Sequence, residues 1–265
     1  MDDEDLLLLA NDEAEDDVAD RPNETSDASE IVERYIPADV RARFETYSYR
    51  NAALILSQAH PVEFEELMEG LRAFSITKHI IREAGGNESK IPKLISAQLR
   101  PKGWHETTIQ ADLLVRLLHS EERRGPRGGK RMERVERELL KAKFLDGHKV
   151  DYIKGSVAFD LEWNSKDQTF DRDLYAFSAF SQCGVIDVGV LLTRSAELNP
   201  VFKTLGMALD NTGKESKTTV AAKYGASTTW MGKLLYRLNA GRNGSCPVLA
   251  FGIRPSCISD LELSS

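Results

Sequence analysis

The sequence has few cysteines, no long apolar run and no net positive charge. Its three cysteines, Cys183, Cys246 and Cys257, are odd in number and widely spaced. This argues against a disulfide framework or a zinc site and favours free thiols in a reducing cytoplasm. No apolar run reaches membrane-spanning length, so we expect no membrane partner. Residues 6–10 are too short and too acid-flanked for a signal peptide, which begins with basic residues.

The formal net charge of −7 is unevenly distributed. Residues 1–33 hold fourteen Asp or Glu and one Arg, a net of −13, which leaves +6 for the remainder. An acidic segment without aromatic residues cannot bury enough apolar surface to offset its ordering entropy. We therefore predict a disordered acidic leader over residues 1–33, a single domain over 34–258 and a short tail over 259–265.

The first part of that domain, residues 34–100, reads as mainly helical. Apolar spacing predicts one or two amphipathic helices between Val40 and Leu56, and another that begins at Pro61. Residues 75–82 continue that helix or form a third one, and residues 91–99 form a short helix. The apolar faces of these helices predict a packed core.

The second part predicts strands alternating with helices. We expect helices over residues 134–144 and 168–181, and buried strands over 185–193 and 248–253. A strand, a helix and a strand in that order form a βαβ-type crossover, so we expect some parallel pairing in the sheet. The fold class is therefore α/β, with a mixed central sheet flanked by helices and preceded by a helical segment.

Residues 148–195 contain the most informative pattern. The apolar run Val157–Leu161 carries Asp160, Glu162 and Asn164 at every second position, which places all three on one side of a strand. Upstream, Asp151 precedes turn residues at 154–156, and a hairpin there would bring Asp151 back beside Glu162. Two converging carboxylates form an oxygen-only site suited to Mg²⁺, which can activate water for attack on a phosphoryl group.

This layout resembles the PD-(D/E)xK nucleases, with Asp151 and Glu162 as the two acids. Asn164 replaces their usual lysine, which is similar to the branch of restriction endonucleases resembling BglII, where an amide occupies that position. Further segments resemble that family in order and spacing. They are Ser89-Lys90, Leu99-Arg100-Pro101-Lys102-Gly103-Trp104, Asp171-Arg172-Asp173-Leu174 and Val190-Leu191-Leu192-Thr193-Arg194.

The resemblance implies a type II restriction endonuclease that hydrolyses double-stranded DNA at a short site. Glu162 and Asp151 would bind Mg²⁺, with the backbone carbonyl of Trp163 as a further ligand. Asp160 is the alternative acid, and an ion pair with a basic neighbour is an equal interpretation of that residue. Asn164 has no basic site near neutral pH, so it can only hydrogen-bond the attacking water. A palindromic target implies a homodimer, and a DNA methyltransferase is expected as a genetic partner.

Several polar segments are candidates for DNA contacts. A glycine-broken basic segment over residues 123–130 could follow the phosphate backbone without reading sequence. By resemblance, residues past the catalytic strand read base edges, and a hydroxyl-rich helix start near residue 228 contacts bases or phosphates. The candidates are Asn87, Ser89, Lys90, Arg123, Arg124, Arg127, Lys130, Ser165, Lys166, Asp167, Arg172, Ser227, Thr228 and Thr229.

Two other functions remain open from the sequence. Residues 210–240 could form a DNA-contacting helical segment, and within it a helix over 220–224 followed by one over 229–238 would make a helix-turn-helix. That reading gives a DNA-binding regulator without catalysis, but it leaves the same-face acids unexplained. A third reading is a nuclease fold that survives as a non-cutting interaction protein.

Overall fold

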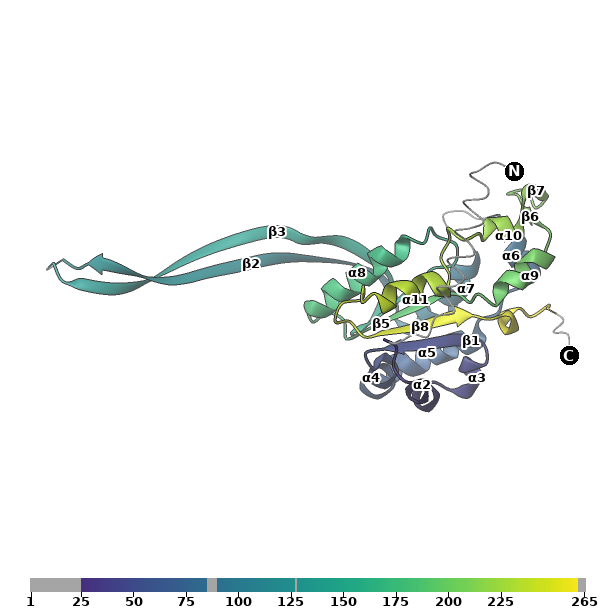
Figure 1. The fold of residues 1–265 in the computed structure, drawn as a ribbon, viewed down its shortest axis with the longest axis horizontal. Helices are drawn as coiled ribbons and strands as arrows, with labels where there is room; N and C mark the ends of the chain where they lie inside the picture. The colour runs from purple at the N-terminus through teal and green to yellow at the C-terminus, as the bar shows by residue number, and fades with distance from the viewer. Residues whose placement is uncertain (1–24, 85–89, 127, 262–265) are drawn as a thin grey trace. The chain divides into compact units, whose positions relative to one another are not determined.

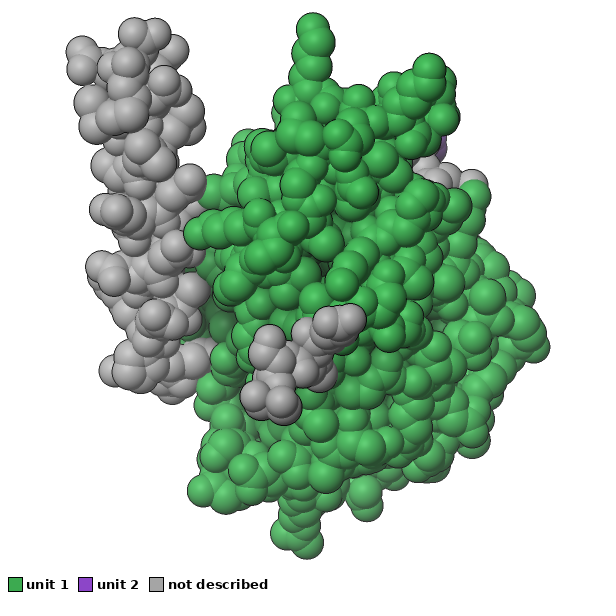
Figure 2. Space-filling model, turned by 90° about the vertical axis from the view of Figure 1, so that its right-hand side faces the viewer, with its two compact units in different colours: residues 1–107, 150–265 green, residues 108–149 purple. Residues whose placement is uncertain are grey.

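The computed structural model describes residues 25–84, 90–126 and 128–261. The chain divides into two compact units. Unit 1 comprises residues 1–107 and 150–265, and unit 2 comprises residues 108–149. Figure 2 shows one face of unit 1. None of the helices in the described part of the chain is long and apolar enough to cross a membrane.

A six-stranded mixed sheet is the centre of the fold, with strand order β1-β8-β5-β4-β3-β2. Strands β4, β5 and β8 run parallel to one another, while β1 and β3 are antiparallel to their neighbours β8 and β4. The strands are β1 (Phe44–Tyr49), β2 (His105–Arg124), β3 (Lys130–Lys154), β4 (Val157–Leu161), β5 (Val188–Arg194) and β8 (Val248–Ile253). The predicted α/β class with a mixed sheet is therefore confirmed.

Helices cover both faces of this sheet (Figure 1). The helices before β2 are α2 (Ser29–Tyr35), α3 (Ala38–Arg41), α4 (Ala52–Ala59), α5 (Pro61–Ala73), α6 (Lys78–Arg82) and α7 (Lys90–Leu99). Those after β4 are α8 (Thr169–Gln182), α9 (Leu198–Thr204), α10 (Val220–Lys223) and α11 (Met231–Asn239). A small antiparallel pair, β6 (Met207–Leu209) and β7 (Glu215–Thr219), lies between α9 and α10.

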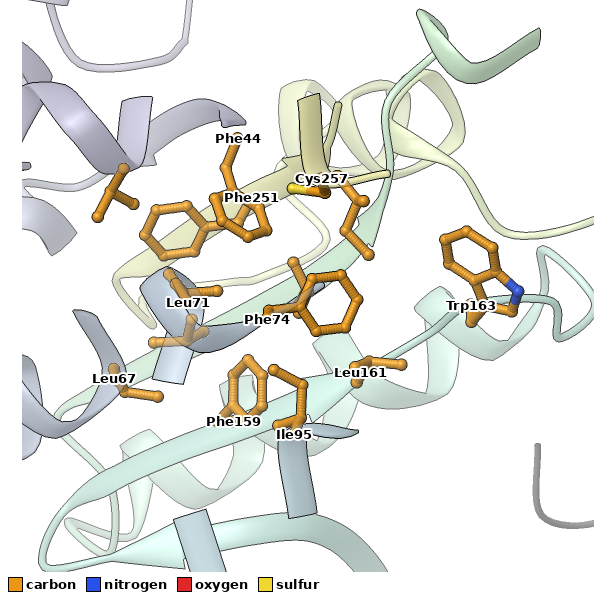
Figure 3. Close-up of a cluster of buried hydrophobic side chains, with 14 of the residues drawn as sticks. Phe44, Leu67, Leu71, Phe74, Ile95, Phe159, Leu161, Trp163, Phe251 and Cys257 are labelled. Atoms are coloured by element: carbon orange, nitrogen blue, oxygen red, sulfur yellow. The ribbon is translucent and has the colours of Figure 1, made fainter. Parts of the chain in front are cut away.

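Alternation along β4 divides its side chains between the two faces. Phe159 and Leu161, with Trp163 beyond the strand end, join the main apolar core (Figure 3). On the opposite face, α8 packs so closely against β5 that a Cβ added at Gly189 would lie 2.3 Å from a ring carbon of Phe177. Asp160 alternates with Phe159 and Leu161 along β4 and therefore points toward α8.

The predicted crossover and hairpin around the acidic strand are both confirmed, but the hairpin register sets Asp151 opposite Asp160 and not, as predicted, beside Glu162. Tyr152 pairs with Phe159 across the β3–β4 hairpin, whose turn contains Gly155 at a φ of 53°. Strand β4 leads through α8 to β5, which pairs with β4 in parallel. Thus the local sequence signals correctly placed the elements that carry the acids.

The predicted helix over residues 134–144 is wrong, because this segment lies inside β3. Charged residues of the two strands pair between β2 and β3. Arg116 donates to Glu138 at 2.9 Å, and Lys130 lies 2.6 Å from Glu122. Alternating charges satisfy a two-stranded ribbon as well as a helix, so the charge pattern alone could not separate the two.

The prediction of one or two helices between Val40 and Leu56 is only partly right. Residues 44–49 form β1, which pairs along its length with β8. Order also begins before residue 34, because α2 starts at Ser29 and buries Val32 in the main core. Residues 1–24 of the predicted leader lie outside the described residues.

The helix-turn-helix reading does not match the structure. Helix α10 has only four residues and directly follows β7, and residues 224–230 separate it from α11. A single turn cannot form the first helix of such a motif. The hydroxyl-rich segment between the two helices instead pairs with residues beyond β4, as described below.

Candidate active site

Two acids from neighbouring strands meet on the α8 face of the sheet. The register of β3 and β4 places Asp151 beside Asp160, and the backbone N–H of Asp151 donates to Asp160 Oδ1 at 2.6 Å. The backbone N–H of Leu161 in turn donates to Asp151 Oδ2 at 3.3 Å. Glu162 follows β4 two residues after Asp160, so the carboxylates share one side, as the alternation predicts.

A fourth acid, Asp173, comes from α8 and was not among the candidates from the sequence. A carboxylate oxygen of Asp173 lies within 4.8 Å of one of Asp160, and Asp173 is buried. The sequence held one usable signal: Asp173 occupies a helical position beside the core residues Phe170 and Phe177, where an apolar residue is expected. An acid on a buried stripe is seldom there for packing alone.

Burial and mutual repulsion raise the pKa values of Asp151, Asp160 and Glu162. Burial raises the pKa of Asp160 well above its ordinary value, and the charges of Asp173 and Asp151 add to that shift. The pKa of Glu162 rises to about 8 through burial and the charge of Asp173. Burial also raises the pKa of Asp151, against the hydrogen bond from Leu161. The cluster therefore concentrates negative charge that the protein itself only partly neutralises.

Three neighbours moderate this charge or extend the site. Arg172 Nη2 lies 3.9 Å from Glu162 Oε1 and 3.3 Å from Asp173 Oδ1. A hydrogen bond from Ser165 also lowers the pKa of Glu162. Asn164 Oδ1 is buried and has no hydrogen-bond partner among the described residues. The predicted amide therefore lies at the site with an acceptor available.

A pocket with a volume of about 610 Å³ opens onto these residues. Asp151, Glu162 and Asn164 line it, together with Glu106. Basic residues from three other segments complete the wall, namely Lys90, Arg100 and Lys223. The predicted first acid, second acid and amide are thus brought together in one cavity that carries both signs of charge.

The donor set fits a hard divalent cation. Asp151, Asp160, Glu162 and Asp173 offer carboxylate oxygens, the ligand type that Mg²⁺ prefers. Asp160 Oδ2 is buried and has no hydrogen-bond partner in the part of the chain that the structure describes. A cation there would satisfy that oxygen and offset the repulsion that raises the pKa values of Glu162 and Asp160.

The backbone carbonyl of Trp163 is already engaged within the protein. Arg194, at the end of β5, donates from Nε to this carbonyl at 2.8 Å and to that of Thr229 at 3.1 Å. Its guanidinium also contacts the rings of Trp163, Phe202 and Tyr224. Burial lowers the pKa of Arg194 to about 10. This buried arginine fixes the strand end that carries Glu162.

The two polar segments beyond the strands pair with each other. Lys166 and Thr228 form an antiparallel bridge, and the N–H groups of Asp167 and Thr229 donate to the carbonyls of Ser227 and Ser165. Lys166 and Ser227 are exposed, but Thr229 is fully buried. The expectation that Thr229 presents its hydroxyl to DNA is therefore wrong in this structure.

Some side chains of these two segments form hydrogen bonds within the protein. Thr228 accepts from Arg194 and donates to the carbonyl of Gly225, while Asp167 accepts from the buried Arg237 at 3.3 Å. Hydrogen bonds to buried groups fix the backbone of this paired segment. The segment is thus a rigid platform whose exposed members are Lys166 and Ser227.

The remaining DNA candidates are spread over two regions. Lys90, at the start of α7, pairs with Glu83 and lines the pocket. In unit 2, the candidates Arg123, Arg124 and Lys130 are exposed at the strand ends. Asn87, Ser89 and Arg127 lie outside the described residues.

Comparison with known proteins identifies the family. The family described as restriction endonuclease BglII/BglIII matches residues 44–253, which include the sheet, the acid cluster and the paired segments. No curated protein sequence matches the chain. Restriction endonucleases generally use a divalent metal ion, in keeping with the oxygen cluster between β4 and α8. The chain therefore belongs to the BglII/BglIII family of restriction endonucleases and is a type II site-specific deoxyribonuclease.

Proposed function

We propose that this enzyme hydrolyses phosphodiester bonds of double-stranded DNA at a short site in a Mg²⁺-dependent reaction. The observation that carries the proposal is the convergence of Asp151, Asp160, Glu162 and Asp173 on one face of the sheet. Repulsion among buried carboxylates favours capture of a divalent cation. The adjoining pocket with basic residues can accept a phosphate group.

Glu162, Asp151 and Asp160 would hold the cation. Bound Mg²⁺ would acidify an attacking water and stabilise charge on the phosphoryl oxygen. Asn164 would orient the attacking water through its free carbonyl oxygen, since an amide cannot accept a proton near neutral pH. Arg172, which is exposed beside Glu162, would hold the scissile phosphate from the opposite side.

The DNA contacts follow from the position of the polar segments. Ser165, Lys166 and Ser227 lie on or beside the paired platform and would meet base edges or phosphates. Lys90 would contact the backbone near the pocket, and the basic residues of unit 2 would contact phosphates without reading sequence. A palindromic site requires two active sites related by a two-fold axis, so we propose a homodimer. A companion methyltransferase would protect the host genome.

Incubation with unmethylated phage DNA tests the proposal. We expect discrete fragments with Mg²⁺ and none with a chelator. Glu162→Ala should abolish cleavage while specific DNA binding persists in Ca²⁺, because only the cation site is changed. Asp187→Ala is a matched control, since this acid is exposed and pairs with His60 away from the cluster. Discrete binding with no cleavage under any divalent ion would sink the proposed reaction.

A further inference from the structure

Arg194, the last residue of β5, is a buried cation without a carboxylate partner in the described part of the chain. Only 1% of its surface is exposed, and burial lowers its pKa to about 10. Taking a cation out of water costs several kcal/mol, and an apolar side chain of similar volume would avoid that cost. A charge kept at this position indicates a role that depends on its hydrogen bonds.

The end of β5 holds the backbone around Glu162 at three successive points. The N–H of Glu162 donates to the carbonyl of Leu192 at 2.9 Å, and Thr193 Oγ1 donates to the carbonyl of Glu162 at 2.8 Å. Arg194 Nε then donates to the carbonyl of Trp163 at 2.8 Å. Glu162 lies just beyond the end of β4, so these contacts with β5 determine where its carboxylate lies.

The guanidinium of Arg194 also holds the platform, in which residues 165–167 pair with residues 227–229. Its Nε donates to the carbonyl of Thr229 at 3.1 Å, and its Nη2 donates to Thr228 Oγ1 at 2.5 Å. A planar group with a fixed fork of donors holds several acceptors in one geometry. A displacement of the platform would therefore displace the guanidinium as well.

The catalytic amide lies between two points that Arg194 holds. The carbonyl of Trp163 accepts directly from Arg194. Ser165 is held through Thr229, whose N–H donates to the carbonyl of Ser165 at 2.9 Å. Asn164 is the single residue between these two points. A misplacement of about 1 Å can cost on the order of 100-fold in rate, so the arrangement bears directly on the chemical step.

We propose that Arg194 is a positioning residue that makes the placement of Glu162 and Asn164 depend on DNA contacts at the platform. The inference rests on the proposed function, which gives these two residues their roles in hydrolysis. Lys166 and Ser227 are the exposed residues of the platform. Their contacts with the correct sequence would act on the catalytic groups through this one side chain. Selection of the correct site would then act on the chemical step as well as on binding.

Single-turnover cleavage of the target, and of a site with one changed base pair that the wild type still cuts slowly, tests this role. Arg194→Lys keeps the charge but loses the planar fork, so it cannot hold all of these acceptors together. We expect its cleavage rate at the target to fall on the order of 100-fold. The rate at the changed site should fall much less, and the ratio of the two DNA affinities in Ca²⁺ should stay the same.

Arg254→Lys is the matched control, because Arg254 is partly exposed and pairs with Glu197. Both of its cleavage rates should equal those of the wild type. A role in folding alone would reduce the number of active Arg194→Lys molecules and lower both rates by the same factor. Equal falls at the two sites would therefore overturn the proposal.

A second pair of variants tests the coupling from the platform, without DNA or metal. Thr228→Val removes the hydroxyl that accepts from Arg194 and keeps the branched shape, whereas Thr228→Ser keeps the hydroxyl. We expect hydrogen exchange at the N–H of Glu162 to become roughly tenfold faster in Thr228→Val and to stay unchanged in Thr228→Ser. This pair decides the coupling even where Arg194→Lys does not fold.

The two measurements separate the coupling from the reaction. Unchanged exchange at Glu162 in Thr228→Val would overturn the coupling, whether or not the protein cuts DNA. A wild-type protein that never cuts DNA would remove the proposed reaction, while faster exchange at Glu162 would still establish that Arg194 connects the platform with the strand end.

Discussion

Asp173 on α8 brings a carboxylate oxygen within 4.8 Å of a carboxylate oxygen of Asp160 on β4. Strand β4 and helix α8 follow one another in the crossover. The short distance between the two carboxylates is set by the packing of α8 on the sheet. Phe177, one turn further along α8, lies directly against Gly189 of β5 and fixes that packing. Two buried carboxyl groups are thereby held together, and their repulsion is relieved either by protonation, which the raised pKa of Asp160 favours, or by a bound cation.

The first prediction concerns Asp173 and its neighbour Asp171. In metal-free protein above pH 8, where Glu162 is ionised, Asp173→Asn should raise the melting temperature, because it removes a charge that repels Glu162 and Asp160. The same variant should gain less stability from added MgCl₂. Asp171→Asn should lower the melting temperature with or without Mg²⁺, because Asp171 pairs with Arg237 and Arg242. Equal responses of the two variants to Mg²⁺ would contradict a role for Asp173 at the site.

The second prediction concerns the pH dependence of stability in the presence of a chelator. Burial raises the pKa of Glu162 from 4.5 to about 8 in the folded protein, so the folded state binds this proton more tightly than the unfolded chain. That contribution to stability is fully present below pH 4.5 and is lost as the pH rises through about 8. The free energy of unfolding, measured with urea, should decline between pH 4.5 and about 8.

Glu162→Gln supplies the comparison for the pH series. The amide cannot ionise, so the variant should lack this part of the decline and be more stable than wild type at pH 8, by an amount on the order of a few kcal/mol. Saturating Mg²⁺ should stabilise wild type most at high pH, where Glu162 is ionised. Parallel pH profiles for the two proteins would show that Glu162 does not titrate in this range.

The third prediction concerns Arg194. Arg194→Met keeps the apolar volume but leaves the buried carbonyls of Trp163 and Thr229 without their donor. We expect a loss of about 2–4 kcal/mol in the free energy of unfolding, since each unsatisfied buried group costs about 1–3 kcal/mol. Arg254→Met is the control, because Arg254 is partly exposed and pairs with Glu197 at 3.3 Å. The free energy of unfolding of Arg254→Met, measured with urea, should fall by less than about 1 kcal/mol.

The fourth prediction concerns the basic residues where β2 ends and β3 begins. Replacing Arg123, Arg124 and Lys130 by Gln should weaken DNA binding equally for target and unrelated sequences, because phosphate contacts carry no base information. The slope of log affinity against log salt should fall by about 2–3, or roughly 0.9 for each phosphate that the protein no longer neutralises. Arg116→Gln, in the middle of β2, should leave the slope unchanged. A sequence-dependent loss, measured by fluorescence anisotropy at several salt concentrations, would assign these residues to base recognition instead.

The sequence by itself determined the acid-bearing hairpin and the crossover that follows it. A strict alternation in Val157–Leu161 put Phe159 and Leu161 in the core and Asp160 on the other face, since successive strand residues point to opposite sides. The turn at Gly155 fixed the register that returns Asp151 to the same face. These features depend on local geometry, so neighbouring residues are enough to specify them.

Only the tertiary structure decided which distant residues complete the site. The residues around Asp173 predict only that it lies in a helix, and its place in the cluster depends on how α8 packs on β5. Thr229 reads as a polar contact, yet pairing with Ser165 buries it. Residues 134–144 have a charge pattern that suits helix and ribbon equally, and only pairing between β2 and β3 selects the strand. In each case, the deciding interaction joins residues far apart in the chain, and its free energy exceeds the weak local preference.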